Sequence, residues 1–409
     1  MSTTSNVTAP SQERAPAALR FVISVMLFLS YMLFAVAWNW GDLYVRSLGF
    51  SASRTALMTN AITIAQVIGS LVAANVLLQL GPRRAFTLAS ALIVFGGFAS
   101  LTEVFPVIFF IRFVLGLGGA LMVVLLSGIV ARILSGRALQ IANGVNSVAF
   151  NTGLAVALTF GMQMNDDPTF AVVLAAGLSL AILVLWLVVS RLGLRGATDG
   201  QQQVDSPYTM RDGFREWFNW VFALAYTGLL SYYIVAFTFM DAGTIRWVVY
   251  AGVIGALGGT LVSARTQDRI KPVVVSVCAA LQIVAATAVL AMADHHLAVL
   301  AGVTLGLVIF FPMPFFVQLA FIRPGVTPRQ IAVTFSIFWA VSYAGSVIFI
   351  QVFAWIADAT GGLGPDNTPV SAAPMIFIVI VEATFLIGSV LLWRWFKAQR
   401  AFEAEEIAA

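Results

Sequence analysis

A charged side chain inside a long apolar stretch can bind an ion or carry a proton, and Arg112 is the basic residue of this kind in the chain. If its stretch crosses a bilayer, the guanidinium costs roughly 2.5–3.5 kcal/mol on insertion scales and cannot deprotonate to escape. Arg112 therefore suits binding an anion or controlling a nearby carboxylate. The alternative is a structural cation bonded to backbone carbonyls and neighbouring side chains.

Two carboxylates, Asp42 and Glu382, also stand in apolar stretches. Asp42 closes the run WNWGD at positions 38–42, so Asn39 and Asp42 are candidates for solute contact, and Asp42 is a candidate proton carrier. Alternatively, Asp42 pairs with Arg46, one helical turn on. Glu382 is a second candidate proton carrier, because a carboxylate removed from water favours its protonated form. The alternative for Glu382 is a structural role.

Uncharged polar side chains recur in three further apolar stretches, near positions 143–151, 226–233 and 342–351. Amide and hydroxyl groups there can hydrogen-bond a solute. They can equally bond between helices or belong to the aromatic belt at a membrane surface. The candidates for solute contact are Asn146, Asn151, Tyr226, Tyr233 and Tyr343.

Other reactive residue types point to no enzyme. His295 and His296 are adjacent, so they cannot share a helix face, and only Asp294 accompanies them; we expect no metal site. Cys278 is the single cysteine, which excludes an internal disulfide. The chain has no GxxxxGK[ST] phosphate-binding sequence. We therefore expect neither a cofactor nor catalysis.

The elements that position these residues follow from composition. The chain has 409 residues, of which 60% are hydrophobic and 10% charged, with a mean hydropathy of +0.95. A soluble domain carries about 25% charged residues, and a membrane-spanning helix needs roughly 20 apolar residues. Continuous apolar runs favour helices over a barrel. We expect spans at 20–46, 54–79, 85–104, 106–130, 138–162, 169–190, 217–240, 244–264, 272–293, 297–320, 330–356 and 374–395.

Positive charge falls on every second connection between these spans. Of 22 Lys and Arg residues, 18 lie on one side, which the positive-inside rule identifies as cytoplasmic, together with both termini. Arg46, Arg54 and Arg246 lie on the other side, and only Arg112 lies within a span. The net charge of +4 and the pI near 9.5 are explained by orientation, so no nucleic-acid partner is expected.

A polar segment divides the twelve spans into two sets of six. We expect a disordered cytoplasmic N-terminus at 1–19, a first bundle at 20–190, a cytoplasmic linker at 191–216, a second bundle at 217–396 and a cytoplasmic tail at 397–409. The halves echo each other weakly: RALQIA opens the fifth span at Arg137, and RQIA opens the eleventh at Arg329. Both features indicate a duplicated architecture.

With these features the chain resembles the major facilitator superfamily. The turn Gly81-Pro82-Arg83-Arg84 is similar to the end of that family's loop motif, and the run from Arg112 to Gly116 is similar to its fourth-span Arg-x-x-x-Gly pattern. The resemblance implies an all-α membrane protein of two six-helix bundles, which enclose a central site and open alternately to either side. Candidate gating residues are Gly81, Arg83, Arg84, Asp268, Pro312 and Pro314.

The chain also departs from the family pattern. Leu78 stands where the loop motif usually has Asp, which places the family's ion-pair latch in question, although Asp268 in the matching loop of the second half could compensate. Many drug–proton antiporters of the family carry a Gly-Pro pair in the fifth span. The run Asn151-Thr152-Gly153-Leu154 at this position contains no such pair. Pro312 and Pro314 each remove a backbone donor and form either a hinge or a fixed kink.

The resulting expectation is a secondary transporter that takes up a small organic or inorganic anion with protons. Alternatives are proton-coupled efflux of drugs or metabolites, a facilitator or exchanger, and, in another class, a non-transporting membrane receptor or assembly protein. The expected partners are the lipid bilayer, a small-molecule substrate and H⁺, with the chain as a monomer. The expected location is the plasma membrane, or the inner membrane of a Gram-negative cell.

Overall fold

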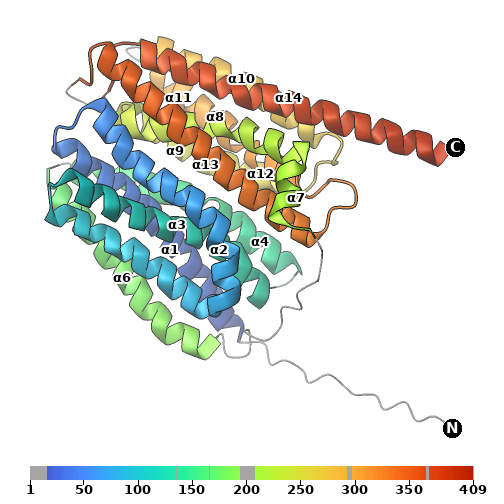
Figure 1. Cartoon of the computed structure of the whole chain (residues 1–409), viewed down its shortest axis with the longest axis horizontal. Coiled ribbons are helices and arrows are strands. Elements are labelled where there is room, and N and C mark those ends of the chain that lie inside the picture. The colour runs from blue at the N-terminus through green and yellow to red at the C-terminus, as the bar shows by residue number, and fades with distance from the viewer. Residues whose placement is uncertain are drawn as a thin grey trace, which may run out of the picture.

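The chain folds into two bundles of long helices that lie side by side (Figure 1). The structure is a computed structural model that describes residues 16–134, 136–164, 166–193, 208–292, 297–364 and 368–408. The expected disordered N-terminus and the turn with His295 and His296 thus fall largely or wholly outside the described residues. Apart from one isolated β-bridge, Leu363 to Pro369, the regular structure in these ranges is helical.

The first bundle contains the predicted spans one to six. Its elements are α1 (Ala17–Ser47), α2 (Ala52–Phe95), the 3₁₀ helix η1 (Gly96–Leu101), α3 (Phe105–Ile133), α4 (Gly136–Ser147), α5 (Ala149–Met164) and α6 (Pro168–Gly193). Helix α2 holds two spans, separated at Gly81, whose φ of 71° lies in the left-handed region that glycine tolerates. The predicted turn at this position is therefore confirmed.

The second bundle follows the linker and contains the predicted spans seven to twelve. Its elements are α7 (Met210–Arg215), α8 (Trp217–Phe239), α9 (Ala242–Ser263), α10 (Lys271–Ala291), α11 (Ala298–Phe310), α12 (Met313–Gln318), α13 (Pro328–Ala359) and α14 (Ala373–Ala408). We call the end where α6 stops and α8 starts the linker end, and the opposite end the far end. Helix α1 begins and α14 finishes at the linker end (Figure 1).

The fifth span differs from its prediction as one straight helix. In the described ranges, eleven spans are each formed by one candidate helix. The fifth span is instead formed by the pair Ile141–Ser147 and Ala149–Gly161, which is bent by 41°. At the bend, Ser147 Oγ donates to Gly144 O at 2.7 Å, and Val148 N bonds Val145 O, three residues back instead of four. Side-chain bonding to the preceding turn is a known cause of helix bending.

The tenth span is broken where the sequence placed two prolines. Helix α11 stops at Phe310, and α12 restarts at Met313 with Pro314 in its first turn. Because proline supplies no backbone donor, the ladder of hydrogen bonds is interrupted there. The break itself is confirmed, whereas a hinge movement at Pro312 and Pro314 stays a prediction.

Small residues let the helices of each bundle approach closely. A methyl group added at Gly116 of α3 would lie 2.6 Å from Ile62 O of α2, and one added at Gly306 of α11 would lie 2.1 Å from Val248 O of α9. Neither distance permits a side chain. In a membrane such contacts replace the hydrophobic effect as the source of helix packing.

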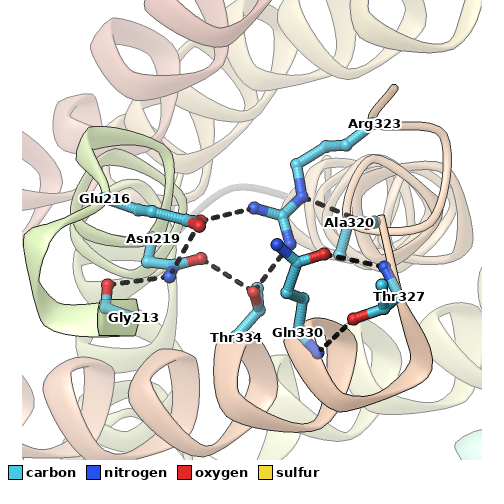
Figure 2. Close-up of polar contacts among 8 residues, drawn as sticks. All are labelled: Gly213, Glu216, Asn219, Ala320, Arg323, Thr327, Gln330 and Thr334. Atoms are coloured by element: carbon cyan, nitrogen blue, oxygen red, sulfur yellow. Dashed lines mark hydrogen bonds and ion pairs between the residues drawn. The ribbon is translucent and has the colours of Figure 1, made fainter. Parts of the chain in front are cut away.

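The linker re-enters the second bundle through a capped helix and a buried polar network (Figure 2). Thr209 and Asp212 form a capping box at the start of α7, and hydrogen bonds from Thr209 hold the pKa of Asp212 below its usual value. Arg323, between α12 and α13, then pairs with Glu216 Oε2 at 2.9 Å and donates to Thr334 Oγ1 at 2.9 Å.

Two further contacts complete this network. Thr334 donates to Asn219 Oδ1 at 2.8 Å, and the Arg323 guanidinium lies 4.5 Å from the centroid of the Phe218 ring. The network thus joins the start of α8 to the α12–α13 connection and to α13, all within the second half.

Replacing Arg323 with Ala should lower the free energy of unfolding by about 2–3 kcal/mol, because charge-assisted hydrogen bonds are lost and Glu216 loses its counter-ion. Thermal unfolding of the purified protein measures the change. Arg329→Ala is the matched control, since Arg329 is exposed and, among the described residues, donates to Tyr208 O alone, at 3.3 Å; its change should stay within about 0.5 kcal/mol. Equal losses in both variants would contradict the network's stabilising role.

Candidate solute site between the two halves

The two ionised residues predicted to be chemically active on the first half meet in a buried ion pair. Arg112 Nη2 bonds Asp42 Oδ1, and Arg112 Nε donates to Met58 O at 3.0 Å. The exposed fractions of Arg112 and Asp42 are 2% and 1%. Gly41 makes room for the guanidinium, because an added methyl group would lie 2.8 Å from Arg112 Nη1. The positive charge of Arg112, which the positive-inside rule does not explain, is therefore balanced by Asp42 within the first bundle.

Arg46 has different partners from those proposed on sequence grounds. Its guanidinium donates to Phe237 O at 3.1 Å and to Thr238 O, both in the last turn of α8. The salt bridge of Asp42 is thus with Arg112, and the alternative pairing with Arg46 is wrong. The reason lies in tertiary structure: α3 and α8 offer partners that a single-helix pattern cannot show.

Aromatic rings from both halves meet toward the far end, beside this ion pair. In α1, Tyr31 stacks on Phe34 with centroids 5.9 Å apart, and Phe34 contacts Trp38 edge-on at 5.8 Å. Trp38 in turn contacts Phe237 of α8 edge-on at 5.6 Å, across the two halves. Ring faces and edges of this kind suit a flat or ring-shaped ligand.

A second aromatic group lies in the second half. Tyr226 of α8 contacts Trp339 of α13 edge-on at 5.8 Å, and Trp339 stacks on Tyr343 at 5.7 Å. Tyr226 and Trp339 are partly exposed, whereas Tyr343 is buried. The predicted residues Tyr226 and Tyr343 therefore belong to one aromatic wall.

A direct hydrogen bond joins the halves near these rings. Tyr233 of α8 donates to Asn151 Oδ1 of α5 at 2.9 Å, and Tyr233 also contacts Phe310 edge-on at 5.0 Å. The structure thus brings together two predicted candidates that are 82 positions apart. Sequence reasoning named both residues but could not pair them.

Toward the far end, the halves are held by a carboxylate that the sequence reasoning missed. Asp358, at the end of α13, accepts from Ala52 N and Ser53 N, each at 3.0 Å, and from Ser53 Oγ. A negative charge at the N-terminus of a helix such as α2 is favourable. The signal available in the sequence was an acidic residue directly after an apolar run. That it faces the start of α2 in the other half is visible only in the structure.

One helical turn or more deeper, an amide pair adds to this closure. Asn60 of α2 donates to Val347 O and to Gln351 Oε1 of α13, both at 3.2 Å. The hydroxyl oxygens of Thr159 in α5 and Tyr250 in α9 lie 2.7 Å apart and form a further hydrogen bond between the two halves. Near the linker end, Gly144 of α4 approaches Thr260 of α9 without a hydrogen bond among the described contacts. The bonds between the halves therefore concentrate at mid-depth and at the far end.

Residues 21–350 match the family described as the Major Facilitator Superfamily. The chain belongs to this superfamily. It is a transporter of this family with many membrane-spanning helices.

The fold of this superfamily member is similar to that of known solute transporters, whereas its sequence identity to them is low. Among curated proteins, the uncharacterized protein Cj0987c of Campylobacter jejuni is 22% identical over 244 residues, covering 57% of this chain and 73% of that protein. The nucleoside transporter NupG superposes with a TM-score of 0.67 at 13% identity, covering 93% of this chain and 99% of that one.

A second solved structure shares the fold. The inward-open conformation of the xylose transporter XylE from E. coli superposes with a TM-score of 0.68 at 14% identity, covering 91% of this chain and 95% of that one. At such identities the likeness shows the fold alone. It confirms the predicted architecture of a major facilitator transporter.

Other candidates predicted for solute contact lie apart from the aromatic wall. Asn146 of α4 lines a cavity of about 480 Å³ between α1 and α4, whose walls include Phe21, Val25 and Phe28. Its Nδ2 atom is buried with no partner among the described residues. Asn39 is buried in α1, with an exposed fraction of 4%.

Glu382, the second candidate proton carrier, lies in the second bundle. It is buried in α14, with an exposed fraction of 1%, and neither carboxylate oxygen has a partner among the described residues. Helix α14 packs against α8, α10 and α13, which all belong to the same half. The described contacts therefore place Glu382 within the second bundle.

The candidate gating residues near the linker end make contacts within their own halves. Arg83 O accepts from Trp186 Nε1 at 3.3 Å, and Asp268 pairs with Lys271 at 2.6 Å. Within the described ranges, Arg83 and Arg84 form no salt bridge. A gating role for this turn stays a prediction.

The aromatic residues of α1 are the main members of the site that sequence reasoning overlooked. Tyr31, Phe34 and Trp38 are spaced by three and four positions, which places them on one helix face. This pattern is visible in the sequence. It is also typical of ordinary core packing, so only the contact with the other half distinguishes it.

Proposed function

We propose that this major facilitator transporter carries a small uncharged solute with a ring, in symport with protons. The observation that carries the proposal is the closed charge balance of the Asp42–Arg112 pair within the first half. Arg112 is neutralised by Asp42, so it presents no unpaired cation to an anion, which was the solute favoured by the sequence. The neighbouring wall offers aromatic rings and hydroxyl groups instead.

The chemistry of this wall supports a ring-bearing solute. Trp339 and Tyr343 present aromatic faces, and their position next to hydroxyl and amide groups is typical of sites that combine apolar contact with a few orienting polar groups. NupG and XylE are named as nucleoside and xylose transporters. Both names describe neutral ring compounds, which agrees with the charge balance but rests on a likeness of fold.

The Asp42–Arg112 pair supports proton coupling. Asp42 Oδ2 is buried and has no hydrogen-bond partner among the described residues, so it can accept a proton. A proton on this carboxylate removes the negative charge that holds Arg112, and the contact between α1 and α3 weakens. Release of the proton restores the pair. The proton thus changes how α1 packs on α3, and α1 also contacts α8, which carries Tyr226 of the aromatic wall.

Symport with an inward proton gradient gives uptake, and orientation identifies the outer side of the protein. We place the linker end in the cytoplasm, because 18 of the 22 Lys and Arg residues belong to connections at that end. The far-end bonds of Asp358 and Arg46 then close the outer side. This arrangement supports uptake from outside. The apolar cavity beside Phe21 and Phe28 favours a second candidate, efflux of amphipathic compounds.

Uptake by proteoliposomes tests these proposals. The purified protein should accumulate xylose or uridine when the outside is made acidic, and a protonophore should abolish the accumulation. Benzoate as an anion and ethidium as an amphipathic cation are the comparison solutes, and liposomes without protein are the control. Selective transport of benzoate would contradict the uncharged class, and proton-driven expulsion of ethidium alone would favour efflux.

A further inference from the structure

One buried glutamine, Gln66 of α2, has both ends of its amide unpartnered among the described residues. Its exposed fraction is 0%, and neither Oε1 nor Nε2 makes a hydrogen bond. The residue stands midway between Ala52, where α2 begins, and the break at Gly81. An amide offers two donors and one acceptor, and buried polar groups are normally satisfied, so this amide is available to bond a ligand.

The helix phase shows where Gln66 points. The α3 side of α2 is fixed by Ile62 and Gly69, which contact Gly116 and Ala120. The α13 side is fixed by Asn60, which bonds Val347 O. At 3.6 residues per turn, Gln66 lies about 40–60° around the helix from the α3 side and about 120° from the α13 side, so it points between them and nearer to α3.

The lipid side of α2 is also excluded. Ile68 and Val72 are 44% and 41% exposed, and Ile68 stands two positions from Gln66, hence about 200° around the helix. Gln66 therefore faces the bundle interior, in the sector between α3 and α13. Because α13 belongs to the second half and carries Trp339 and Tyr343, this sector lies next to the helix that bears the aromatic wall.

A line of polar residues accompanies Gln66 on this face. Thr59, Thr63 and Ser70 lie within about 60° of it at 3.6 residues per turn, and their exposed fractions are 0%, 0% and 2%. Thr63 bonds to Asn60, whereas the hydroxyls of Thr59 and Ser70 have no partner in the described part of the chain. This face is therefore a polar stripe in which Thr59, Gln66 and Ser70 have side-chain atoms without a hydrogen-bond partner among the described residues.

We propose that Gln66 is a specificity-determining residue that hydrogen-bonds the transported solute through both ends of its amide. The solute then carries a donor and an acceptor side by side, as in a vicinal diol or the amide edge of a nucleobase. This inference deepens the proposed function and rests on it. The aromatic wall would hold the ring, and Gln66 would select the polar edge.

The variant Gln66→Met tests the inference, because Met has a similar volume and no hydrogen-bonding amide. Gln282→Met is the matched control: Gln282 is also 0% exposed, but it donates to Val308 O at 2.6 Å within the second half. Thermal unfolding of each full-length protein is followed without solute and with xylose or uridine. Uptake of the same two probes is then measured.

The expected result separates recognition from folding. Without solute, Gln66→Met should unfold at the same temperature as the wild type or higher, because an unsatisfied buried amide is removed. Its apparent affinity for the probe should fall by about 10- to 100-fold. Gln282→Met should instead unfold at a lower temperature and keep the probe affinity.

Three outcomes would overturn the inference. A clearly lower unfolding temperature of solute-free Gln66→Met would show that the amide has a structural partner. Unchanged probe affinity in a stable Gln66→Met protein would contradict this inference while leaving the proposed function intact. A wild type that neither binds nor transports either probe would contradict the proposed class of solute, and this inference with it.

Discussion

Asp42→Ala should lower the free energy of unfolding by about 3–5 kcal/mol, because it leaves the guanidinium of Arg112 buried without its counter-ion. The pair is almost inaccessible to solvent, so water cannot replace the lost carboxylate. The double variant Asp42→Leu with Arg112→Leu should recover most of this loss, since an apolar pair needs no counter-charge. Thermal unfolding of the purified variants measures both effects.

The same pair should separate stability from transport. Although the double variant folds, it should show no proton-driven accumulation, because no carboxylate remains to bind the proton. Asp42→Asn should keep a hydrogen bond to Arg112 and retain solute exchange, while losing accumulation driven by a proton gradient. Intact accumulation by Asp42→Asn would remove Asp42 from the coupling mechanism. A double variant as unstable as Asp42→Ala would show that the ion pair is not the source of the lost stability.

Combining Asp358→Ala with Arg46→Gln should open the far end. Asp358 bonds the first residues of α2, and Arg46 bonds the last turn of α8, so each charge joins the two halves at a helix terminus. Asp358 is exposed, and solvent therefore weakens its contribution. Together the two changes should shift the population by about 1–2 kcal/mol, or roughly 5- to 30-fold.

Cysteine labelling from the far side measures this opening. Cys278 is the single natural cysteine, so Cys278→Ser provides a background for Thr59→Cys, a buried position on the interior face of α2. The rate of modification by an impermeant maleimide should rise in the Asp358→Ala, Arg46→Gln protein.

Asp241→Ala is the matched control for this opening. Asp241 is another exposed acid at the far end, but it caps α9 within its own half by accepting from Thr244 N at 2.9 Å. Its loss should leave the labelling rate unchanged. Equal rates in the wild type, the control and the double variant would show that the two charges do not hold the far end closed.

Several features of the site were accessible from the sequence because they are local. Arg112 and Asp42 were singled out because each is an ion in an apolar run, and this depends only on neighbouring residues. The break at Gly81 and the interruption at Pro312 follow from the backbone restrictions of glycine and proline. The bend between α4 and α5 was missed, because it depends on how Ser147 bonds the preceding turn.

The partners of these residues were not accessible in the same way. Helical spacing suggested Arg46 as the partner of Asp42, since it lies one turn away. The structure instead pairs Asp42 with Arg112, 70 positions on. Gln66 and Asp358 were overlooked for the same reason, because the role of a buried amide or a terminal carboxylate depends on which groups of other helices lie beside it.

The amino-acid sequence by itself determined that this protein is a membrane-embedded set of helices. Apolar length and charge alternation suffice for the helices and their orientation, because transfer into lipid depends on the composition of each segment; the repeated architecture stays a prediction from the weak echo of the halves. Only the tertiary structure decided that Arg112 is neutralised, that the aromatic rings of both halves meet, and that the far end is closed. These properties depend on which faces of distant helices come into contact, and segment composition does not encode that choice.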